Sequence, residues 1–122
     1  MTEQRLVDVS NLEAALNQFA AQRGWERFHS PKNLAMALTG EVGELVEHFQ
    51  WLTEEESKSA AQNPQTAQQV KDELADVLLY LVRMASVLGV DLNQAVTAKM
   101  LANAAKYPVG ADTPSPWGNR TS

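Results

Sequence analysis

Hydrophobic residues recur at helical spacing along most of the chain, and capping residues mark where each run begins. The stretch Ser10–Glu13 has the form of a capping box, and the apolar positions that follow predict a first helix ending near Gly24. Ser30 followed by Pro31 predicts the start of a second helix, which the same periodicity extends to about Leu52. The loop between these helices carries three ring side chains, those of Trp25, Phe28 and His29.

The rest of the chain is also predicted to be helical. The expected elements are a short helix opened by a capping box over Thr53–Glu56, a long helix over Gln65–Leu88 and a last helix over Leu92–Lys106. Pro64 interrupts the chain before the long helix, Gly89 stops that helix, and Asp91 caps the last one. No alternating strand pattern competes, so the predicted fold is all-α, a four-helix bundle with an additional short helix. We expect a domain over residues 1–108 and a flexible tail rich in Pro, Gly and Ser over 109–122.

Two of the predicted helices carry continuous apolar stripes that predict the hydrophobic core. The stripes consist of Leu34, Leu38, Val42, Leu45, Phe49 and Leu52 in the second helix and of Val70, Leu74, Val77, Leu81, Met84 and Leu88 in the long helix. The long helix is also apolar on its flanks, at Leu78, Leu79 and Val82, where a helix bordering water would be polar. This second apolar surface predicts a homo-oligomer with helices paired across a subunit interface.

Composition and charge limit the classes of function. The chain has 122 residues, of which 44% are hydrophobic, and this predicts one domain able to bury a core. A net charge of −5 argues against a nucleic-acid or anionic-membrane surface. The absence of cysteine excludes disulfides, thiolate metal sites and a cysteine nucleophile. The N-terminus lacks the apolar core of a signal peptide and no apolar run approaches the ~18 residues of a membrane span, so we expect a cytoplasmic protein.

Acidic pairs border the predicted core on two helices. The second helix carries E-x-x-E at Glu41 and Glu44, and the long helix carries E-x-x-D at Glu73 and Asp76. Side chains three residues apart converge on one spot, so two antiparallel helices can bring four oxygen donors together. Four such acids could not stay ionised together without a divalent cation. All-oxygen donors, with His48 out of register, favour Mg²⁺ or Mn²⁺ over iron or zinc.

Each of these features also has an ordinary structural interpretation. An isolated E-x-x-E on a helix is usually a solvated face, and it is the presence of two acidic pairs at a core border that favours a metal site. The ring side chains of the first loop and Trp51 could stack on a nucleobase or could pack the core and loops. Lys99 and Asn103, one turn apart on the last helix, could contact phosphate or form a solvated face.

Four segments of the chain resemble one protein family. In order, they are RGWERFHSPKNL (23–34), GEVGELVEHFQW (40–51), DELADVLLYLV (72–82) and KMLANAAKYP (99–108). They are similar to the all-α nucleoside triphosphate pyrophosphohydrolases related to MazG, and most similar to the small dCTP pyrophosphatase branch. The paired acidic motif is specific to that superfamily, while W-x-x-F-H-x-P-x-N-L and F-Q-W point to the branch. The resemblance implies Mg²⁺-dependent hydrolysis of dCTP or a related nucleoside triphosphate to the monophosphate and pyrophosphate, which would sanitise the nucleotide pool.

The resemblance also implies roles for individual residues. The catalytic acids and Mg²⁺ ligands would be Glu41, Glu44, Glu73 and Asp76. The nucleotide would be contacted by Trp25, His29, Asn33, Trp51, Tyr80, Lys99 and Asn103. Members of the family assemble as dimers or tetramers, in agreement with the second apolar surface of the long helix. Where close relatives can carry a nucleotide-facing histidine this chain has Leu16, so the resemblance does not imply which base is preferred. Two alternatives stay open: an enzyme acting on many or modified dNTPs, and a non-catalytic helical oligomerisation module.

Overall fold

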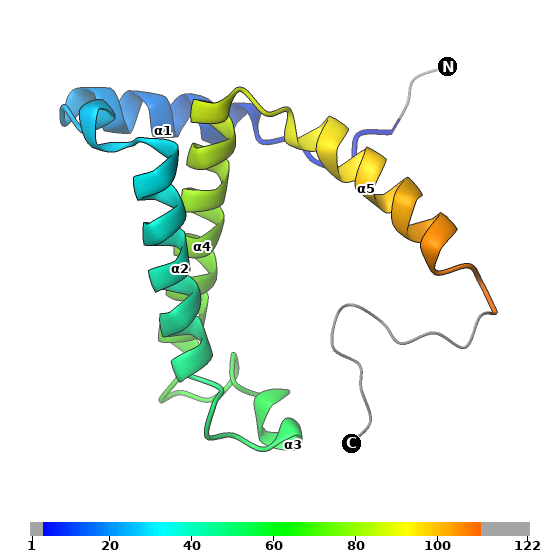
Figure 1. Ribbon diagram of the computed structural model, residues 1–122. Helices are drawn as coiled ribbons and strands as arrows, with labels where there is room; N and C mark the ends of the chain where they lie inside the picture. Colours follow the sequence, from blue (N-terminus) through cyan, green and yellow to red (C-terminus); the bar gives the residue numbers. More distant parts are fainter. Residues whose placement is uncertain (1–3, 111–122) are drawn as a thin grey trace. The chain divides into compact units, whose positions relative to one another are not determined.

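The computed structural model describes residues 4–110, and within them every regular element is a helix (Figure 1). The elements are α1 (Ser10–Gln22), the 3₁₀ helix η1 (Glu26–Phe28), α2 (Pro31–Glu47), α3 (Glu54–Ser57), α4 (Ala67–Leu88) and α5 (Leu92–Lys106). The expected all-α class, with four long helices and one short helix, is therefore confirmed. The predicted tail lies largely outside the described residues, which end at residue 110.

The chain divides into two compact units. The larger unit runs from Val9 to Val90 and contains α1 to α4. The other unit joins the segment before Val9 to the segment that begins at Asp91 and contains α5. In this second unit the Asn93 side-chain oxygen accepts hydrogen bonds from the backbone nitrogens of Leu6 and Val7, at 2.9 and 3.1 Å, which ties the N-terminal segment to α5.

Side-chain caps start three of the helices where the sequence predicts them. The Ser30 hydroxyl accepts from the backbone nitrogen of Asn33 at the start of α2, and the Asp91 carboxylate accepts from that of Gln94 at the start of α5. At α3, Thr53 and Glu56 form a complete capping box, and these hydrogen bonds with Thr53 hold the pKa of Glu56 below its usual value. The caps fix the helix starts because they satisfy backbone N–H groups that have no partner inside the helix.

Two predicted helix boundaries are wrong. The cap of α1 is Val9 rather than Ser10, because the backbone N–H of Glu13 already bonds to the carbonyl of Val9. Helix α2 ends at Glu47 rather than near Leu52. The residues after it form consecutive turns, since the N–H of Leu52 bonds to the carbonyl of Phe49 three residues earlier.

Glycines in the left-handed region end α1 and α4. Gly24 has φ of 63° and Gly89 has φ of 71°, a conformation that costs little only for glycine. At each end the next residue, Trp25 or Val90, donates its N–H to a carbonyl five residues earlier in the helix. The Gly24 turn thereby brings Trp25 back against the last turn of α1.

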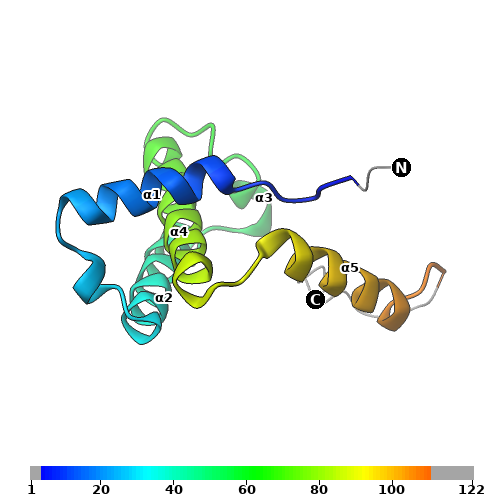
Figure 2. The same ribbon diagram turned by 90° about the horizontal axis from the view of Figure 1, so that it is seen from above.

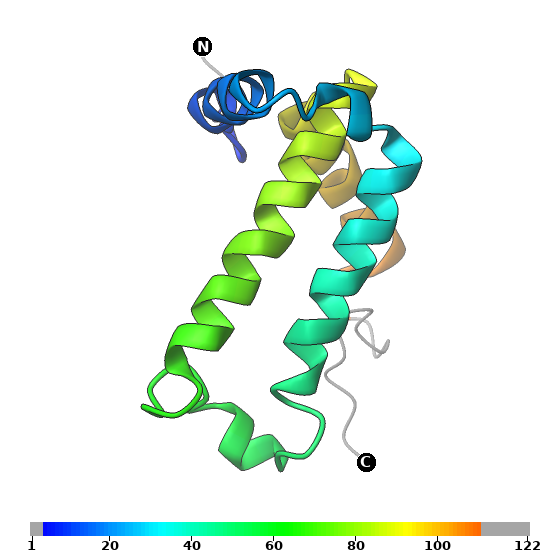
Figure 3. The same cartoon turned by 90° about the vertical axis from the view of Figure 1, so that its left-hand side faces the viewer.

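Helices α2 and α4 lie side by side and antiparallel, and α1 crosses α4 (Figures 2 and 3). The buried apolar residues of the described chain are Ala20, Leu34, Ala60, Val70, Val82 and Ala85. Val82, which we expected at a subunit interface, is fully buried inside the unit, while Leu74 and Leu81 from the predicted core stripe are 53% and 42% exposed. The reason is that α4 packs against α1 as well as α2, and two adjacent apolar stripes in a sequence do not reveal which of them the neighbouring helices cover.

Candidate functional site

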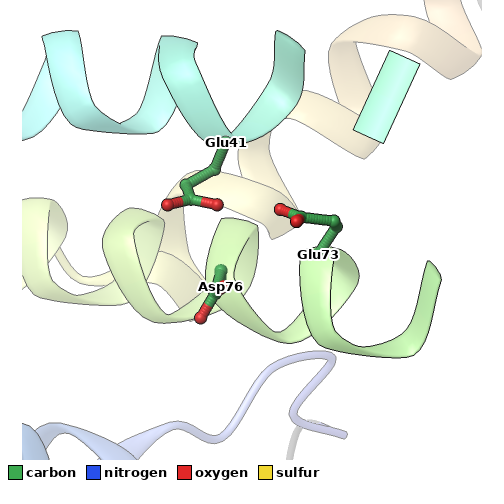
Figure 4. A group of neighbouring side chains, drawn as sticks. All are labelled: Glu41, Glu73 and Asp76. Carbon is green, nitrogen blue, oxygen red and sulfur yellow. The ribbon is translucent and has the colours of Figure 1, made fainter. Parts of the chain in front are cut away.

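The predicted acidic motifs meet where α2 and α4 face each other. Glu41 extends from α2, while Glu73 and Asp76 belong to the opposing helix α4 (Figure 4). All three are half-buried, and each offers one carboxylate oxygen within 4.8 Å of the others. Three carboxylates at this separation could hold a metal ion. The fourth predicted ligand, Glu44, is exposed and stands outside this three-residue group.

The electrostatics of the three-carboxylate cluster favour the binding of a cation. The pKa of Glu41 is raised to about 7, first by a hydrogen bond shared with Glu73, then by burial and by the negative charges of Glu44 and Asp76. The pKa of Glu73 is also raised, mainly by desolvation and further by Glu44 and Asp76. The Oε2 atoms of Glu41 and Glu73 are buried and have no hydrogen-bond partner among the described residues. Orphaned carboxylate oxygens of this kind are the hard donors that Mg²⁺ and Mn²⁺ prefer, so the residues fit a divalent metal.

The raised pKa of Glu41 makes the stability of the metal-free protein depend on pH. Its value is about 7 in the folded protein against an ordinary 4.5, so the folded state binds more protons between these pH values. The stabilising contribution is complete below the lower value and is lost as the pH rises through the higher one. We expect the melting temperature in EDTA to fall by roughly 5 °C between pH 5 and pH 8. Circular dichroism melts test this, and a pH dependence that Glu41→Gln leaves equally steep would contradict it.

A cleft lies beside the carboxylates in the same unit and shares Asp76 with them. It has a volume of about 170 Å³ and is lined by Leu16, Phe19, Ala20, Trp25, His29, Leu34, Asp76, Leu79, Tyr80 and Arg83. One wall is aromatic: the rings of Phe19 and Trp25 pack edge to face at 5.6 Å, and those of Trp25 and His29 at 6.3 Å. Such a wall offers flat apolar surface next to an acidic centre.

Arg83, which also lines the cleft, is the centre of a hydrogen-bonded polar network. Arg83 on α4 donates from Nε to Nδ1 of His29 at 3.0 Å and from Nη1 to the side-chain oxygen of Asn17 on α1. Burial and then the charge of Arg83 lower the pKa of His29, so its ring is neutral at pH 7. Because Nδ1 accepts the hydrogen bond, the proton of the neutral imidazole is on Nε2.

The structure gathers only part of the predicted nucleotide site. Trp25, His29 and Tyr80 line the cleft together with Asp76. The Asn33 side chain instead donates to the carbonyl of Phe28 at 3.0 Å and braces the loop that carries η1.

The other predicted contacts are not part of this cleft. Trp51, in the turns after α2, is 85% exposed and does not line it. Lys99 and Asn103 lie on α5 in the other unit, so their contact with the nucleotide stays a prediction.

Arg83 is the site residue that sequence reasoning missed. It interrupts the run LLYLV–MASVL as a single charged residue, four and seven positions after Leu79 and Asp76 respectively. A lone cation on the stripe that carries an acidic motif is a signal, but periodicity alone assigns it to a solvated flank. Its burial by α1, which crosses the helix there, was not readable from the sequence.

Fold and site together define an all-helical protein whose paired helices present an acidic, metal-capable centre beside an aromatic cleft. Comparison with known proteins agrees with this class. The profile of the MazG-like family matches residues 37–118, and the chain therefore belongs to the MazG-like family. The resemblance read from the sequence is confirmed.

Individual relatives extend this result. The chain is 48% identical over 108 residues to dCTP pyrophosphatase 1 of Bos taurus, covering 88% of this chain and 62% of the relative. It is 47% identical over 106 residues to dCTP pyrophosphatase 1 of Homo sapiens, covering 87% of this chain and 61% of that protein. The structure is similar to that of a pyrophosphatase from Archaeoglobus fulgidus, with a TM-score of 0.76 and 35% identity over 88% of this chain and 99% of that one. The chain thus spans somewhat less than two thirds of the length of the curated relatives it matches.

Proposed function

We propose that this protein is a Mg²⁺-dependent nucleotide pyrophosphohydrolase that converts a deoxynucleoside triphosphate, dCTP or a close relative, to the monophosphate and pyrophosphate. The observation that carries the proposal is the meeting of Glu41, Glu73 and Asp76 at the edge of an aromatic cleft, with two buried carboxylate oxygens left without partners. The names of the relatives, dCTP pyrophosphatase 1 and a pyrophosphatase, support the reaction and the substrate.

The acids would hold the metal and thereby position the triphosphate. Glu41, Glu73 and Asp76 would be its ligands, and Glu44, whose charge already acts on Glu41 and Glu73, would complete the set. When bound, Mg²⁺ supplies Lewis-acid stabilisation of the charge that develops on the phosphate oxygens and lowers the pKa of coordinated water. A triphosphate and four carboxylates repel each other, so without a divalent ion the substrate would not enter the site.

The cleft residues would orient the nucleoside. Trp25 and His29 supply flat faces on which a base can stack, and Tyr80 lies on α4 one turn beyond Asp76, between the acids and the polar end of the cleft. A base held there leaves the phosphates at the carboxylates. No serine, cysteine or histidine nucleophile is needed, because water attacks the α-phosphorus.

Release of pyrophosphate from a panel of nucleotides tests the proposed function. The purified protein is incubated with Mg²⁺ and each of dCTP, dTTP, dUTP, dATP and dGTP, and both products are quantified. Preferential cleavage of dCTP supports the proposal. Equal cleavage of all substrates would favour the broad-specificity alternative, and cleavage of none would favour a non-catalytic helical module.

Aromatic contact with the base gives a prediction for Trp25 and Trp51. Stacking is worth ~1–3 kcal/mol per base, so we expect Trp25→Ala to raise the KM for dCTP by about one to two decades. The effect belongs mainly in KM because the ring is remote from the reacting phosphorus. We keep Trp51 as a second proposed base contact and expect Trp51→Ala to act in the same direction.

Steady-state kinetics and melting temperatures on the same preparations check these variants. A variant that melts earlier but keeps its KM for every nucleotide has lost packing and not a base contact. Trp25→Phe is the matched control, since it retains a stacking face and should keep most of the affinity.

Exposed apolar residues support the proposed homo-oligomer. Leu74, Leu78 and Leu81 recur at helical spacing on α4 and are 53%, 48% and 42% exposed, while Leu34 and Val82 are the largest fully buried side chains of the described chain. The buried core is small and the apolar surface exposed on α4 is large. These two features fit a chain that pairs the Leu74, Leu78 and Leu81 face with a second copy, as a dimer or tetramer. None of the helices within residues 4–110 has the length and apolar composition that crossing a membrane requires. The proposed nucleotide substrate keeps the cytoplasm as the proposed location.

A further inference from the structure

Arg83 is a nearly buried cation in the wall of the aromatic cleft. Its exposed fraction is 8%, and it forms no ion pair with any carboxylate that the structure describes. A buried charge is costly unless hydrogen bonds and opposite charges compensate it. The described surroundings of Arg83 supply hydrogen bonds but no paired carboxylate.

The position of the guanidinium is fixed by two side chains on other elements. His29, after η1, accepts from Nε at 3.0 Å, and Asn17 on α1 accepts from Nη1. The same Asn17 oxygen lies 3.5 Å from the Ser86 hydroxyl, one turn further along α4. Nη2 has no hydrogen-bond partner among residues 4–110. The guanidinium thus uses Nε–H and one N–H of Nη1, and its remaining N–H groups, on Nη1 and Nη2, stay available for a ligand.

The two polar side chains that line this end of the cleft, Arg83 and His29, offer a ligand only donors. Arginine has no acceptor, and the neutral ring of His29 has its accepting nitrogen occupied by Arg83, which leaves Nε2–H. A ligand group that binds here must therefore present acceptors.

The order of residues along α4 sets which part of a nucleotide reaches Arg83. Asp76, Tyr80 and Arg83 are at positions i, i+4 and i+7, so Arg83 lies about 10 Å along the helix from the acidic centre. With the phosphates at the carboxylates, the opposite end of the substrate, the base, meets the donor groups.

We propose that Arg83, held by Asn17 and His29, is the specificity-determining residue that reads the base through its acceptor edge and selects cytosine. This proposal rests on the proposed function and adds the residue that makes the choice. Cytosine presents O2 and N3 as adjacent in-plane acceptors, which match the fork of a guanidinium. Thymine and uracil place the N3–H donor between their two carbonyls, so the same fork would face a donor.

The test compares substrates across variants. Arg83→Met keeps much of the side-chain volume and removes the donors. We expect its kcat/KM for dCTP to fall by about 10- to 100-fold, as for loss of one bidentate base contact worth ~1–3 kcal/mol, while that for dTTP changes less than about threefold. Arg83→Lys should not restore selectivity, because an ammonium lacks the fork. Asn17→Ala, which loosens the guanidinium without removing it, should show a smaller loss in the same direction.

The control is Arg27→Met, because Arg27 is an exposed arginine on η1 that stacks on Phe28 and does not line the cleft. It removes the same charge and should leave the ratio of kcat/KM for dCTP to kcat/KM for dTTP unchanged. If Arg83→Met fails to fold by circular dichroism, Asn17→Ala carries the test.

Several results would overturn the proposal. An equal loss of kcat/KM for all nucleotides would mean that Arg83 acts on the phosphates or on the fold. An unchanged ratio of kcat/KM for dCTP to that for dTTP in both Arg83→Met and Asn17→Ala would exclude base reading. A selective loss for dGTP would mean that Arg83 reads guanine, whose O6 and N7 also suit arginine. Failure of the proposed function is separate, since the wild-type protein would then release no pyrophosphate from any nucleotide. In that case calorimetric binding of dCMP and dTMP to wild-type and Arg83→Met proteins still decides whether Arg83 reads the base.

Discussion

Replacing Glu41 or Glu73 with glutamine is expected to abolish nucleotide hydrolysis while leaving the fold intact. The amide preserves the shape of the side chain and removes the charge that would hold the proposed metal. Loss of several kcal/mol of transition-state stabilisation lowers kcat/KM by about three orders of magnitude or more. Pyrophosphate release with saturating Mg²⁺ measures the effect.

The same variants should be more stable than wild type when no metal is present. In Glu41→Gln the repulsion among Glu41, Glu44 and Asp76 is relieved, and this repulsion contributes to the raised pKa of Glu41. Glu47→Gln, an exposed acid at the end of α2, is the matched control and should change neither activity nor stability. Activity within tenfold of wild type in the Glu41 and Glu73 variants would remove them from the essential ligands.

Leu78→Glu is expected to separate the proposed oligomer into monomers. Leu78 is at the centre of the exposed apolar face on α4, and in a two-fold symmetric interface the substitution introduces a charge from each copy. Burying these unpaired charges costs about 4 kcal/mol, which raises the dissociation constant by roughly a thousandfold. Sedimentation velocity at low micromolar concentration should then show a single monomeric species.

The control for this experiment is Gln62→Glu, which adds the same charge at an exposed position in the turns between α3 and α4. It should sediment as wild type does. A wild-type protein that is already a compact monomer at this concentration would disprove the interface. Retention of the wild-type assembly by Leu78→Glu would place the contact on another surface.

The sequence was informative wherever the structure depends on local chemistry. The caps at Ser30, Thr53 and Asp91 and the left-handed Gly89 each satisfy or end a helix within a few residues, so they can be read from the chain directly. The acidic motifs were legible in part: Glu73 and Asp76, three residues apart on α4, converge with Glu41 as their spacing indicates, whereas Glu44 stands outside this group.

What could not be predicted depends on which helices are neighbours. The burial of Val82 and the exposure of Leu81 follow from the crossing of α1 over α4. The Arg83 network joins side chains 54 and 66 positions apart in the chain, and no local pattern encodes such a meeting. The position of Trp51 was predicted on a helix that the structure does not continue so far. Helix α2 was expected to reach about Leu52, but it ends at Glu47, and Trp51 lies in the turns beyond it with an exposed fraction of 85%.

The separation of Asp76 from Arg83 on one straight helix also bears on how this protein can diverge. Substitutions about 10 Å apart that share no partners usually have additive effects on free energy. The donors at the Arg83 end contact α1 and the η1 loop, whereas the acidic centre is formed by α2 and α4. If Arg83 reads the base as proposed, changes in α1 at Asn17 or Leu16 would alter which base is accepted without disturbing the centre that would cleave the phosphate chain. A family built on this helix can evolve new substrate ranges while inheriting one reaction.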